Sequence, residues 1–361
     1  MHNVLIAGAG RIGTLIACLL AGTQDYQVYV VDIQFNNTEF NRLHQQFANL
    51  KILTINVQKQ QALAELVKQY SIQTIISCLP YYCNSALAKL AKELKLNYFD
   101  VTEDVQVSNE IQQLAKNAKT IFMPHCGIAP GFVNIAAHTL MQGFDELDTA
   151  KLRVGALPQY IDNALHYALT WSTDGLINEY GNAGQAIENR TIVSTEPLAD
   201  LESLILTGVR YEAFNTSGGL GTLINTYQDK IKYLNYKTIR YPGHCEKMRF
   251  LMQDLKLNQD RQTLKTILDN ALPRAQQDIA IIYIAVSGKK ANQFVEEIYF
   301  NKIYPQTIAN THWSAIQLST ASSACAVIDL TLTQQRYHGF VLQEQFTLAD
   351  VFTNRFGKYI K

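Results

Sequence analysis

The chain has 361 residues, which is enough for two domains that each bury a core. Basic and acidic residues number 31 each, so the formal charge is zero, and this balance argues against nucleic acid or an anionic membrane surface as a partner. Hydrophobic residues are 47% and charged residues 17% of the chain, as in an ordinary globular protein. Small molecules are therefore the expected partner class.

The first predicted element is a buried strand, Val4–Ala7, which runs into a glycine-rich turn and then a helix pattern to about Ala21. Gly8, Gly10 and Gly13 have the GxGxxG spacing of a dinucleotide-binding loop. In that loop the first glycine permits a tight turn, the second lets the backbone approach a pyrophosphate, and the third lets helix and strand pack. The helix start then offers free N–H groups to the phosphates.

The second predicted strand, "YQVYVVD", ends at Asp32, about 20 residues after the glycines, and this context makes the motif specific. A carboxylate at this place accepts a hydrogen bond from a ribose 2′-hydroxyl and repels a 2′-phosphate. Ile33 and Gln34 follow it, so no adjacent basic residue can hold such a phosphate. The sequence therefore predicts NAD, rather than NADP, as the cofactor.

The apolar N-terminal stretch, Val4–Gly22, has some character of a signal peptide. No basic segment precedes it, and Arg11 and three glycines interrupt it, so we expect neither a signal peptide nor a membrane helix. The six cysteines lie far apart and form no CxxC pair. This usage favours reduced thiols and a cytoplasmic location over a disulfide scaffold.

Strand and helix patterns alternate to about residue 126, which predicts an α/β fold class with a doubly wound parallel sheet of Rossmann type. Ligands bind outside the carboxyl ends of the strands in such a sheet. "SCLPYY" and "DVTED" follow two of these ends, so both should border the cofactor. The candidate cofactor-binding residues are Gly8, Gly10, Arg11, Ile12, Gly13, Asp32, Ile33, Cys78, Leu79, Pro80, Asp100 and Val101.

The "DVTED" segment also supplies two candidate catalytic residues, Thr102 and Glu103, because it lies at a predicted carboxyl edge. The alternative is a solvated acidic loop in which Asp104 caps the next helix. Metal chemistry is not predicted, although histidine and cysteine are adjacent at 125–126 and 244–245. Neighbouring side chains on a strand point to opposite faces, so neither pair can easily supply two ligands to one zinc ion.

The regular alternation ends after Gly127, where Pro130 and Gly131 mark a turn at a helix start. Long strand patterns follow, including "YLNYKTIRY", "DIAIIYIAVSGKK" and "NQFVEEIYFNKIY", which read as antiparallel. They predict a second, α+β domain with a mostly antiparallel sheet. A long apolar helix after Thr311 should return to the first domain, because its apolar surface exceeds what a tail needs. The predicted domains are a Rossmann domain at 1–126, a substrate and dimerisation domain at 127–311, and C-terminal helices at 312–361.

The stretch "YKTIRYPGHCEK", residues 236–247, is the densest group of polar side chains. On a strand Tyr236, Thr238 and Arg240 share one face, and His244 follows the Pro-Gly turn. The guanidinium suits a carboxylate, and an imidazole near a helix start is biased toward its neutral form and suits a base. Thr238 and Tyr236 can orient a substrate or water. The alternatives are an ordinary ion pair for Arg240 and a helix cap or core position for His244, while Lys237 faces the other way and is expected to be structural.

Three further candidates for substrate binding come from the second domain. Asp174 lies six residues before Tyr180 in "STDGLINEY", a spacing at which at most one of the two faces a substrate. Ser217 and Gly218 form either a backbone cradle or a turn that starts a helix.

The segments "GAGRIG", "APGFVN", "WSTDGLINEY", "NTSGG" and above all "YKTIRYPGH" resemble the saccharopine dehydrogenase-like oxidoreductases, in order and spacing from residue 4 to about 250. Within that family the NAD-dependent lysine 6-dehydrogenase branch is the most similar. The resemblance implies a Rossmann domain, a substrate domain before C-terminal helices, a homo-oligomer, and oxidation at an amine-bearing carbon of an amino acid. Residues 182–216 match no part of the family pattern.

Two other functions stay open at this point. The first is a related reductase that joins an aldehyde acid to an amine, as in saccharopine or carboxylated-polyamine synthesis. The second is a catalytically silent NAD-binding protein. Intact glycines together with a polar wall in the second domain favour an enzyme over the silent alternative, although a fold alone does not decide between them.

Overall fold

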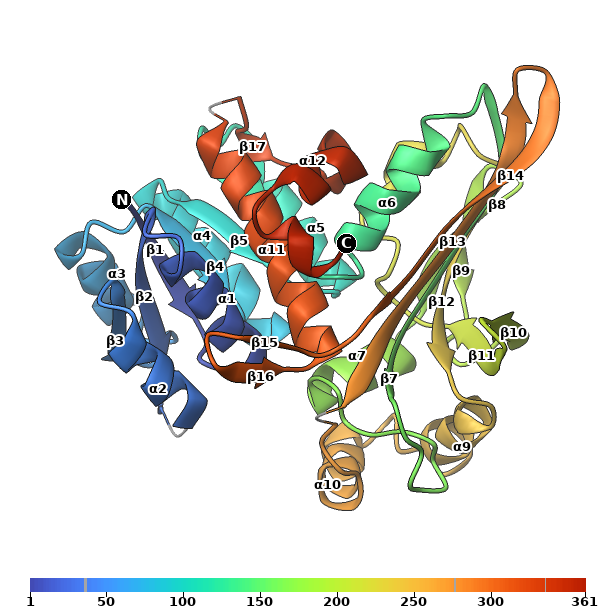
Figure 1. Ribbon diagram of the computed structural model, residues 1–361, viewed down its shortest axis with the longest axis horizontal. Coiled ribbons are helices and arrows are strands. Elements are labelled where there is room, and N and C mark those ends of the chain that lie inside the picture. The colour runs from blue at the N-terminus through green and yellow to red at the C-terminus, as the bar shows by residue number, and fades with distance from the viewer. Residues whose placement is uncertain (36–37, 276, 335) are drawn as a thin grey trace. The chain divides into compact units, whose positions relative to one another are not determined.

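The structure is a computed structural model that describes residues 1–35, 38–275, 277–334 and 336–361 (Figure 1). The chain divides into two compact units. The first unit comprises Met1–Gly131, Thr307–Trp313 and Gln317–Lys361, and the second comprises Phe132–Gln306 and Ser314–Ile316. The C-terminal segment therefore belongs to the first unit, as the predicted fold class has it.

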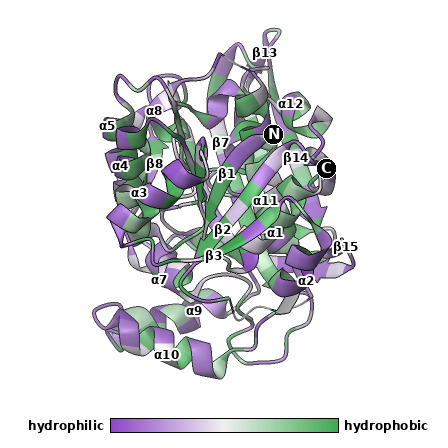
Figure 2. Ribbon diagram, turned by 90° about the vertical axis from the view of Figure 1, so that its left-hand side faces the viewer, coloured by the Kyte–Doolittle hydropathy of each residue, from purple (hydrophilic) through white to green (hydrophobic). Residues whose placement is uncertain are grey.

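The first unit is built on a parallel sheet, which among the described residues has seven strands in the order β17-β6-β5-β4-β1-β2-β3. Its strands are β1 (His2–Ala7), β2 (Tyr26–Asp32), β3 (Leu50–Thr54), β4 (Thr74–Ser77), β5 (Asn97–Asp100), β6 (Ile121–Met123) and β17 (Gly339–Phe340). The chain changes direction across the sheet between β1 and β4, which is the place where a doubly wound sheet binds its ligand. The apolar side chains of β1 to β3 give this region its hydrophobic colour in Figure 2.

Helices complete the first unit: α1 (Arg11–Ala21), α2 (Thr38–Gln46), α3 (Gln60–Gln69), α4 (Asn84–Leu94), α5 (Val105–Ala115), α11 (Ala315–Thr333) and α12 (Leu348–Thr353). The sequence prediction missed α2, because "TEFNRLHQQ" is polar and shows too few apolar positions for a clear helical period. Among the described residues, α11 alone is long and apolar enough to cross a membrane, and 89% of its apolar window is buried inside the structure.

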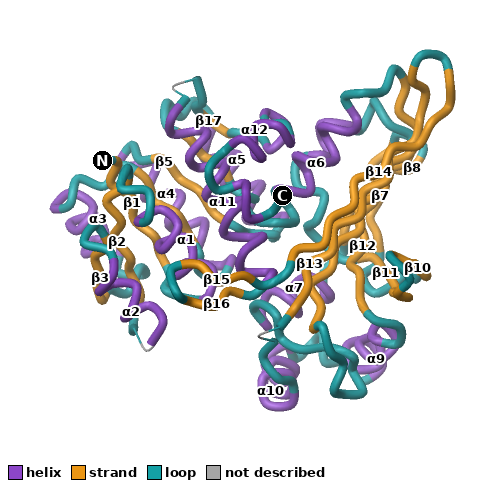
Figure 3. The backbone as a smooth tube through the Cα atoms, in the orientation of Figure 1, coloured by secondary structure: helices purple, strands orange, loops and turns teal. Residues whose placement is uncertain are grey.

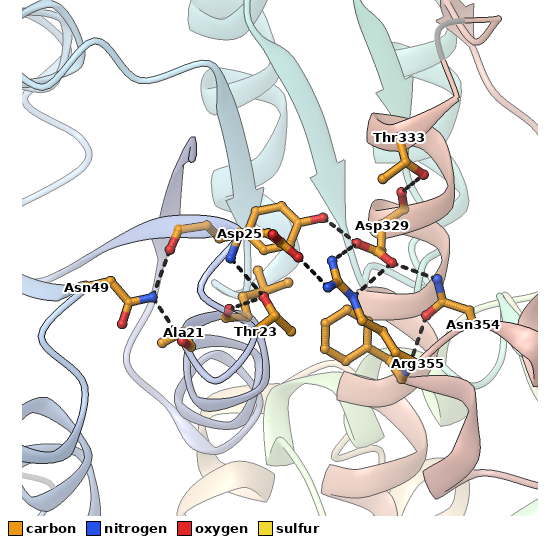
Figure 4. Close-up of polar contacts among 11 residues, drawn as sticks. Ala21, Thr23, Asp25, Asn49, Asp329, Thr333, Asn354 and Arg355 are labelled. Carbon is orange, nitrogen blue, oxygen red and sulfur yellow. Dashed lines mark hydrogen bonds and ion pairs between the residues drawn. The ribbon is translucent and has the colours of Figure 1, made fainter.

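A polar cluster fastens the C-terminal segment within the first unit (Figure 4). The buried carboxylate of Asp329 on α11 accepts hydrogen bonds from Tyr26 Oη at 2.6 Å and from Asn354 Nδ2 at 2.8 Å. It also pairs with Arg355, whose guanidinium reaches Asp25 as well. The carboxylate, although buried, thus has a cation and neutral donors, which is the arrangement that a buried charge requires.

The second unit is built on a mixed sheet whose long strands lie side by side in Figure 3. In the described part of the chain the main order is β10-β11-β12-β7-β13-β14, and β8 pairs with β12 and β9. The strands are β7 (Glu146–Pro158), β8 (Gly184–Glu188), β9 (Thr191–Thr195), β10 (Glu202–Leu206), β11 (Val209–Asn215), β12 (Tyr233–Arg240), β13 (Asp278–Lys290) and β14 (Gln293–Ile303). Most neighbours are antiparallel, as predicted, but β12 runs parallel to β7. Expecting β12 to be antiparallel throughout was wrong, because pairing direction depends on the partner strand and not on the strand's own pattern.

The remaining elements of the second unit are α6 (Phe132–Met141), α7 (Thr173–Gly181), α8 (Leu223–Tyr227), α9 (His244–Arg249) and α10 (Arg261–Ala271). The region that matched no family pattern, residues 182–216, forms β8 to β11. β13 and β14 form the predicted hairpin, with Ala291 and Asn292 at its turn in left-handed conformations. β12 lies between β11 and β7, so both of its edges are paired, and its last five residues are buried.

Candidate functional site

The glycine-rich loop of the first unit has the geometry that its motif predicts. Gly8 has φ +105°, a conformation that L side chains rarely adopt. A Cβ on Gly13 would lie 1.9 Å from the carbonyl oxygen of Gly8, so only glycine lets α1 pack against the turn. A Cβ on Gly10 would meet nothing within 4 Å, which leaves open space beside the start of α1. Each glycine thus has the property that a dinucleotide loop requires.

Asp32 closes this loop from the end of β2. Its carboxylate accepts hydrogen bonds from the backbone N–H of Ala9 and of Ile33, both at 2.7 Å. Ile33 is itself exposed, and the next residue is Gln34. Because each carboxylate oxygen has two lone pairs, Asp32 can still accept from a ribose hydroxyl.

The segment after β4 lies against the same loop. A Cβ on Gly8 would be 3.0 Å from the backbone oxygen of Cys78 and 3.2 Å from a methyl of Leu79, and the Cys78 N–H donates to Ala7. Together with the open start of α1, which no side chain caps, these residues fit a dinucleotide at the switch point of the sheet.

The "DVTED" segment has hydrogen bonds both within itself and to neighbouring residues, including one from the Cys126 N–H to the Asp100 carbonyl. Asp100 is fully buried and accepts from Tyr98 Oη and from the backbone N–H of Thr102, each at 2.9 Å, and burial raises the pKa of its carboxyl to about 6. Thr102 is buried and its hydroxyl accepts from the Asp104 N–H, while Asp104 caps α5. Glu103 is half-buried. The helix-cap alternative is therefore present in the structure, and the catalytic roles of Thr102 and Glu103 stay a prediction.

The second unit gathers most of the other candidate residues on one face of β12. A Cβ on Gly219 would meet the ring of Tyr236 at 2.4 Å, so the segment Ser217–Gly219 lies directly on that ring. Thr238 Oγ1 donates to Glu179 Oε1 at 2.7 Å, and the backbone N–H of Ser217 donates to the Glu179 carbonyl. Tyr236, Thr238, Ser217 and Gly218 are thus brought together beside the C-terminal end of α7.

Arg240 is the charged residue of this group, and it is only 2% exposed. Among the described residues no carboxylate lies within ion-pair distance of its guanidinium, and its Nε is buried without a hydrogen-bond partner. The guanidinium lies 5.1 Å from the ring centre of Tyr167 and 5.6 Å from that of Tyr180. The hydroxyl of Tyr167 is likewise buried and unpartnered.

The carboxylate that could have neutralised Arg240 is engaged elsewhere. Glu212 on β11 is its cross-strand partner and is buried. Its two oxygens accept from the backbone N–H groups of Gly243 at 2.7 Å and of Cys245 at 2.6 Å, at the start of α9. The turn that places His244 thus binds the carboxylate that lies opposite Arg240, and the guanidinium donates a hydrogen bond to the carbonyl oxygen of Ile239.

His244 lies fully buried beside Arg240. Its Nδ1 is 2.9 Å from the carbonyl oxygen of Leu165, an acceptor only, so this nitrogen carries the hydrogen. Burial, followed by the charge of Arg240, lowers the pKa of His244 to about 3, which keeps the ring neutral. Its Nε2 must therefore accept, and Tyr180 Oη donates to it across 3.2 Å. Burial raises the pKa of Tyr180 well above its ordinary value and keeps that proton in place.

Glu179 adds an anion to the same group of residues. It is buried, and its Oε1 accepts from Thr216 at 2.9 Å as well as from Thr238. Its charge is one of the influences that raise the pKa of Arg240 against the opposing effect of burial. Sequence reasoning missed Glu179 and Tyr167. Glu179 stands next to Tyr180 in "STDGLINEY", but nothing in a single sequence showed that β12 packs against that helix.

Asp174, another candidate substrate-binding residue, forms an ion pair with a residue outside the group around β12. Its carboxylate is 2.5 Å from Lys265 Nζ on α10, and it lies in the first turn of α7. Tyr180, six residues further on, is the member of this pair that joins Arg240 and His244. Lys237 faces the opposite way, as predicted, and pairs with Asp200 and Glu202. No group of three or more His, Cys, Asp or Glu residues in the described ranges is placed to hold a metal ion.

Fold and loop together define a two-part protein: a Rossmann-type dinucleotide-binding unit joined to a unit with a mixed sheet. Comparison with known proteins agrees with this class. Residues 4–123 match the family model "Saccharopine dehydrogenase NADP binding domain", and residues 127–360 match "Saccharopine dehydrogenase C-terminal domain". The chain therefore belongs to the saccharopine dehydrogenase family.

Individual relatives are distant. Mitochondrial alpha-aminoadipic semialdehyde synthase of Rattus norvegicus is 22% identical over 327 residues, which cover 83% of this chain and 33% of the relative, and the Mus musculus protein is 21% identical with the same coverage. The chain thus spans about a third of the length of these relatives.

Two solved structures share the fold over nearly the whole chain. Saccharopine dehydrogenase (L-Glu forming) from Saccharomyces cerevisiae has a TM-score of 0.77 at 15% identity, covering 97% of this chain and 95% of that one. Homospermidine synthase from Legionella pneumophila, solved in complex with NAD, has a TM-score of 0.68 at 12% identity, covering 99% and 90%. At such identities the likeness concerns the fold.

Proposed function

We propose that the chain is an NAD-dependent oxidoreductase that acts at the amine-bearing carbon of an amino acid such as lysine. The observation that carries the proposal is the buried guanidinium of Arg240, which has no carboxylate partner among the described residues. A buried charge without a partner is costly, so its retention favours a ligand anion. Membership of the saccharopine dehydrogenase family supports the reaction class.

The substrate carboxylate binds Arg240 in this proposal. The guanidinium offers a rigid fork for two parallel hydrogen bonds, and the hydroxyl of Tyr167 is a further unpartnered donor at the same ring stack. Glu179 supplies a negative charge for the substrate's ammonium group, which would suit a zwitterionic amino acid. The proposed substrate site is also lined by Tyr236 and Thr238 and by the backbone at Ser217 and Gly218.

His244 and Tyr180 form the proton path of the proposal. Oxidation removes a hydride from carbon and a proton from the neutral amine, and water then hydrolyses the imine to a carbonyl and ammonia. The nicotinamide, when bound, accepts the hydride. Tyr180 passes the amine proton to His244 Nε2, along the hydrogen bond already present. Burial is the main cause of the lowered pKa of His244, and the charge of Arg240 is the second; a carboxylate on Arg240 would offset this second effect, so that substrate binding raises the pKa of His244 in part.

The cofactor choice rests on Asp32 and on the glycine loop. We propose NAD because the carboxylate would repel a 2′-phosphate and no adjacent basic residue offsets it. Asp32→Ala should relax this preference, and wild-type protein that turned over NADP as well as NAD would contradict it. Gly10→Ala should abolish binding and keep the fold, since its methyl would enter open space. Calorimetry on the folded variant is the test.

A second candidate function is the reverse-direction reaction, in which an aldehyde acid and an amine are joined and reduced. Membership of the saccharopine dehydrogenase family supports it as well, because saccharopine is a product of joining an aldehyde acid to an amine. The same residues serve both directions. We also propose a homo-oligomer in the cytoplasm, where the six free cysteines would stay reduced.

The deciding experiment measures NADH formation across a panel of diamino acids and polyamines, with oxidation of NADH and NADPH in the presence of aldehyde acids as the reverse arm. Turnover with a diamino acid alone supports the dehydrogenase. Turnover only when an aldehyde acid and an amine are supplied together supports the second candidate. Tight NAD binding without turnover in either arm would favour the catalytically silent protein.

A further inference from the structure

The first unit contains a buried carboxylate whose hydrogen-bond donors are all neutral. Asp100 is the last residue of β5 and is fully buried. Its carboxylate accepts hydrogen bonds from Tyr98 Oη and from the backbone N–H groups of Thr102 and His125. No Lys, Arg or His side chain in the described part of the chain lies within ion-pair distance of it. Asp100 thus joins the loops that follow β5 and β6 without the help of a cation.

Asp329, a second buried carboxylate of the same unit, shows the contrast. Arg355 pairs with Asp329 (Figure 4), whereas Asp100 has no such partner in the described ranges. Burial raises the pKa of the Asp100 carboxyl to about 6, so the group is still ionised at neutral pH. A positive charge on a nearby ligand would therefore stabilise a carboxylate that the described chain leaves without a cation.

The position of Asp100 in the sheet indicates which ligand carries that charge. In the strand register Asp100 pairs with Ser77 of β4, and Ser77 pairs with Ala7 of β1, the residue before the glycine loop. Two strand spacings of about 4.8 Å separate Asp100 from that loop. A dinucleotide crosses the switch point with one nucleotide over each half of the sheet, and Asp32 on β2 marks the adenosine half. The nicotinamide half is then the one that contains β4 and β5.

We propose that Asp100 stabilises the positive charge of the oxidised nicotinamide ring, so that its charge strengthens the binding of NAD relative to NADH. The ring carries one positive charge in NAD and none in NADH, whereas adenosine and pyrophosphate are the same in both. Asp100 acts through space, because its side chain is fully buried and is bound to the loops after β5 and β6. It is therefore a positioning residue with a fixed charge and not a group that touches the ring.

The inference rests on the nicotinamide cofactor of the proposed function and adds a direction to it. Stabilising the oxidised form lowers the reduction potential of the bound couple, by about 30 mV for each tenfold change in the ratio of the two affinities. When NADH gives its hydride to a substrate carbon, the ring gains the positive charge that Asp100 stabilises. The residue thus favours the reductive joining of an aldehyde acid and an amine, which is the second candidate function.

The test is calorimetry of the full chain at pH 7.5 with three ligands: NAD, NADH and ADP-ribose, which lacks the nicotinamide ring. Asp100→Asn should weaken NAD binding about tenfold and change the affinities for NADH and ADP-ribose by less than about twofold. Asp329→Asn is the matched control, since it also removes a buried negative charge from the first unit. It should leave the ratio of NAD to NADH affinity unchanged.

The pH dependence of the wild-type protein provides a second measurement. The Asp100 carboxyl ionises near pH 6, so the ratio of NAD to NADH affinity should rise about fivefold between pH 5 and pH 7.5. The groups around Asp100 stay neutral over most of this range, because burial raises the pKa values of Tyr98, Cys78 and Cys126 and lowers that of His125 to about 4. In Asp100→Asn the ratio should be independent of pH.

An equal loss of affinity for all three ligands in Asp100→Asn would overturn the inference, because the residue would then only hold the loops. If Asp100→Asn does not fold, a wild-type ratio that stays flat from pH 5 to pH 7.5 overturns the inference by itself. All of these measurements are made without an amino-acid substrate. Wild-type protein with the expected pH-dependent ratio but no turnover of amines or aldehyde acids would support the inference and contradict the proposed function.

Discussion

Two arginines of the second unit are almost equally buried and have opposite surroundings. Arg153 on β7 is 1% exposed and pairs with Glu202, which Lys237 also contacts. Arg240 on β12 is 2% exposed and has two aromatic rings but no carboxylate within ion-pair distance in the described ranges. Lys237 is the cross-strand partner of Arg153 and lies three residues before Arg240, so the two arginines occupy opposite faces of the sheet.

In the proposed function, this difference separates a structural cation, Arg153, from a ligand-binding one, Arg240. Arg153 completes a cluster that is neutral enough to be stable without any ligand. Arg240 lacks its anion because Glu212 is bound to the amides that start α9. Burial alone therefore carries no functional meaning. The informative observation is burial without a carboxylate at ion-pair distance, because such a cation keeps hydrogen-bond donors that a ligand anion can use.

The largest effect on catalysis should come from substitution of His244, whose pKa depends in part on the charge of Arg240. His244→Asn should lower kcat by about 10²–10⁴, since it removes the proposed base. The variant should also flatten the acid limb of the pH–rate profile. Steady-state kinetics on folded protein measures both. A variant that melts early but turns over substrate at the wild-type rate would reduce His244 to a core residue and direct attention to Thr102 and Glu103.

Arg240→Lys should raise KM about ten- to a hundredfold with a smaller change in kcat, because a bidentate contact worth roughly 1.5–3 kcal/mol is lost equally from ground and transition states. Arg153→Lys is the matched control on the other face and should leave KM unchanged. If both substitutions raised KM to the same extent, the distinction between a structural and a binding arginine would fail.

Removal of the charge should affect the free energy of unfolding more at Arg153 than at Arg240, which is the opposite order from the effect on KM. Arg153→Met leaves the acid of its pair without its guanidinium and should lower the free energy of unfolding by about 1.5–3 kcal/mol. Arg240→Met loses two ring contacts but also removes a desolvated charge, so its change should stay below about 1 kcal/mol. Urea unfolding of the two variants gives the comparison, and a larger loss for Arg240→Met would show that its charge is compensated in the free protein.

The last prediction concerns the pH dependence of stability. The pKa of His244 is lowered to about 3 in the fold, so between pH 6.5 and 3 the unfolded chain binds a proton that the folded chain does not. The stability contributed by neutral His244 is therefore present above pH 6.5 and lost on acidification, by up to about 1.4 kcal/mol per pH unit. His125, whose pKa burial lowers to about 4, acts in the same direction. Melting curves at pH 7 and pH 5 should show a smaller acid loss for His244→Asn than for wild type; equal losses would contradict the assignment.

Much of the first unit could be predicted from the sequence because its signals are local. Gly8 and Gly13 need conformations or spaces that only glycine allows, and Asp32 stands at the end of the next strand. Each of these requirements is met within one strand–turn–helix–strand unit, so a short stretch of sequence is enough to predict the local structure. The polar helix α2 was missed for the same reason, since its residues carry no clear apolar period.

In the second unit the sequence by itself determined the face that Tyr236, Thr238 and Arg240 share, because alternation along a strand is a local property. It could not determine which groups meet that face. Only the tertiary structure places Tyr167, Glu179 and Tyr180 near Arg240. It also places the carboxylate of Glu212 at the backbone amides that begin α9. These contacts join residues that lie 30 to 80 positions apart, and they depend on which strands and helices pack together. The charge state and the available lone pairs of the candidate site are therefore consequences of packing, which no short stretch of sequence contains.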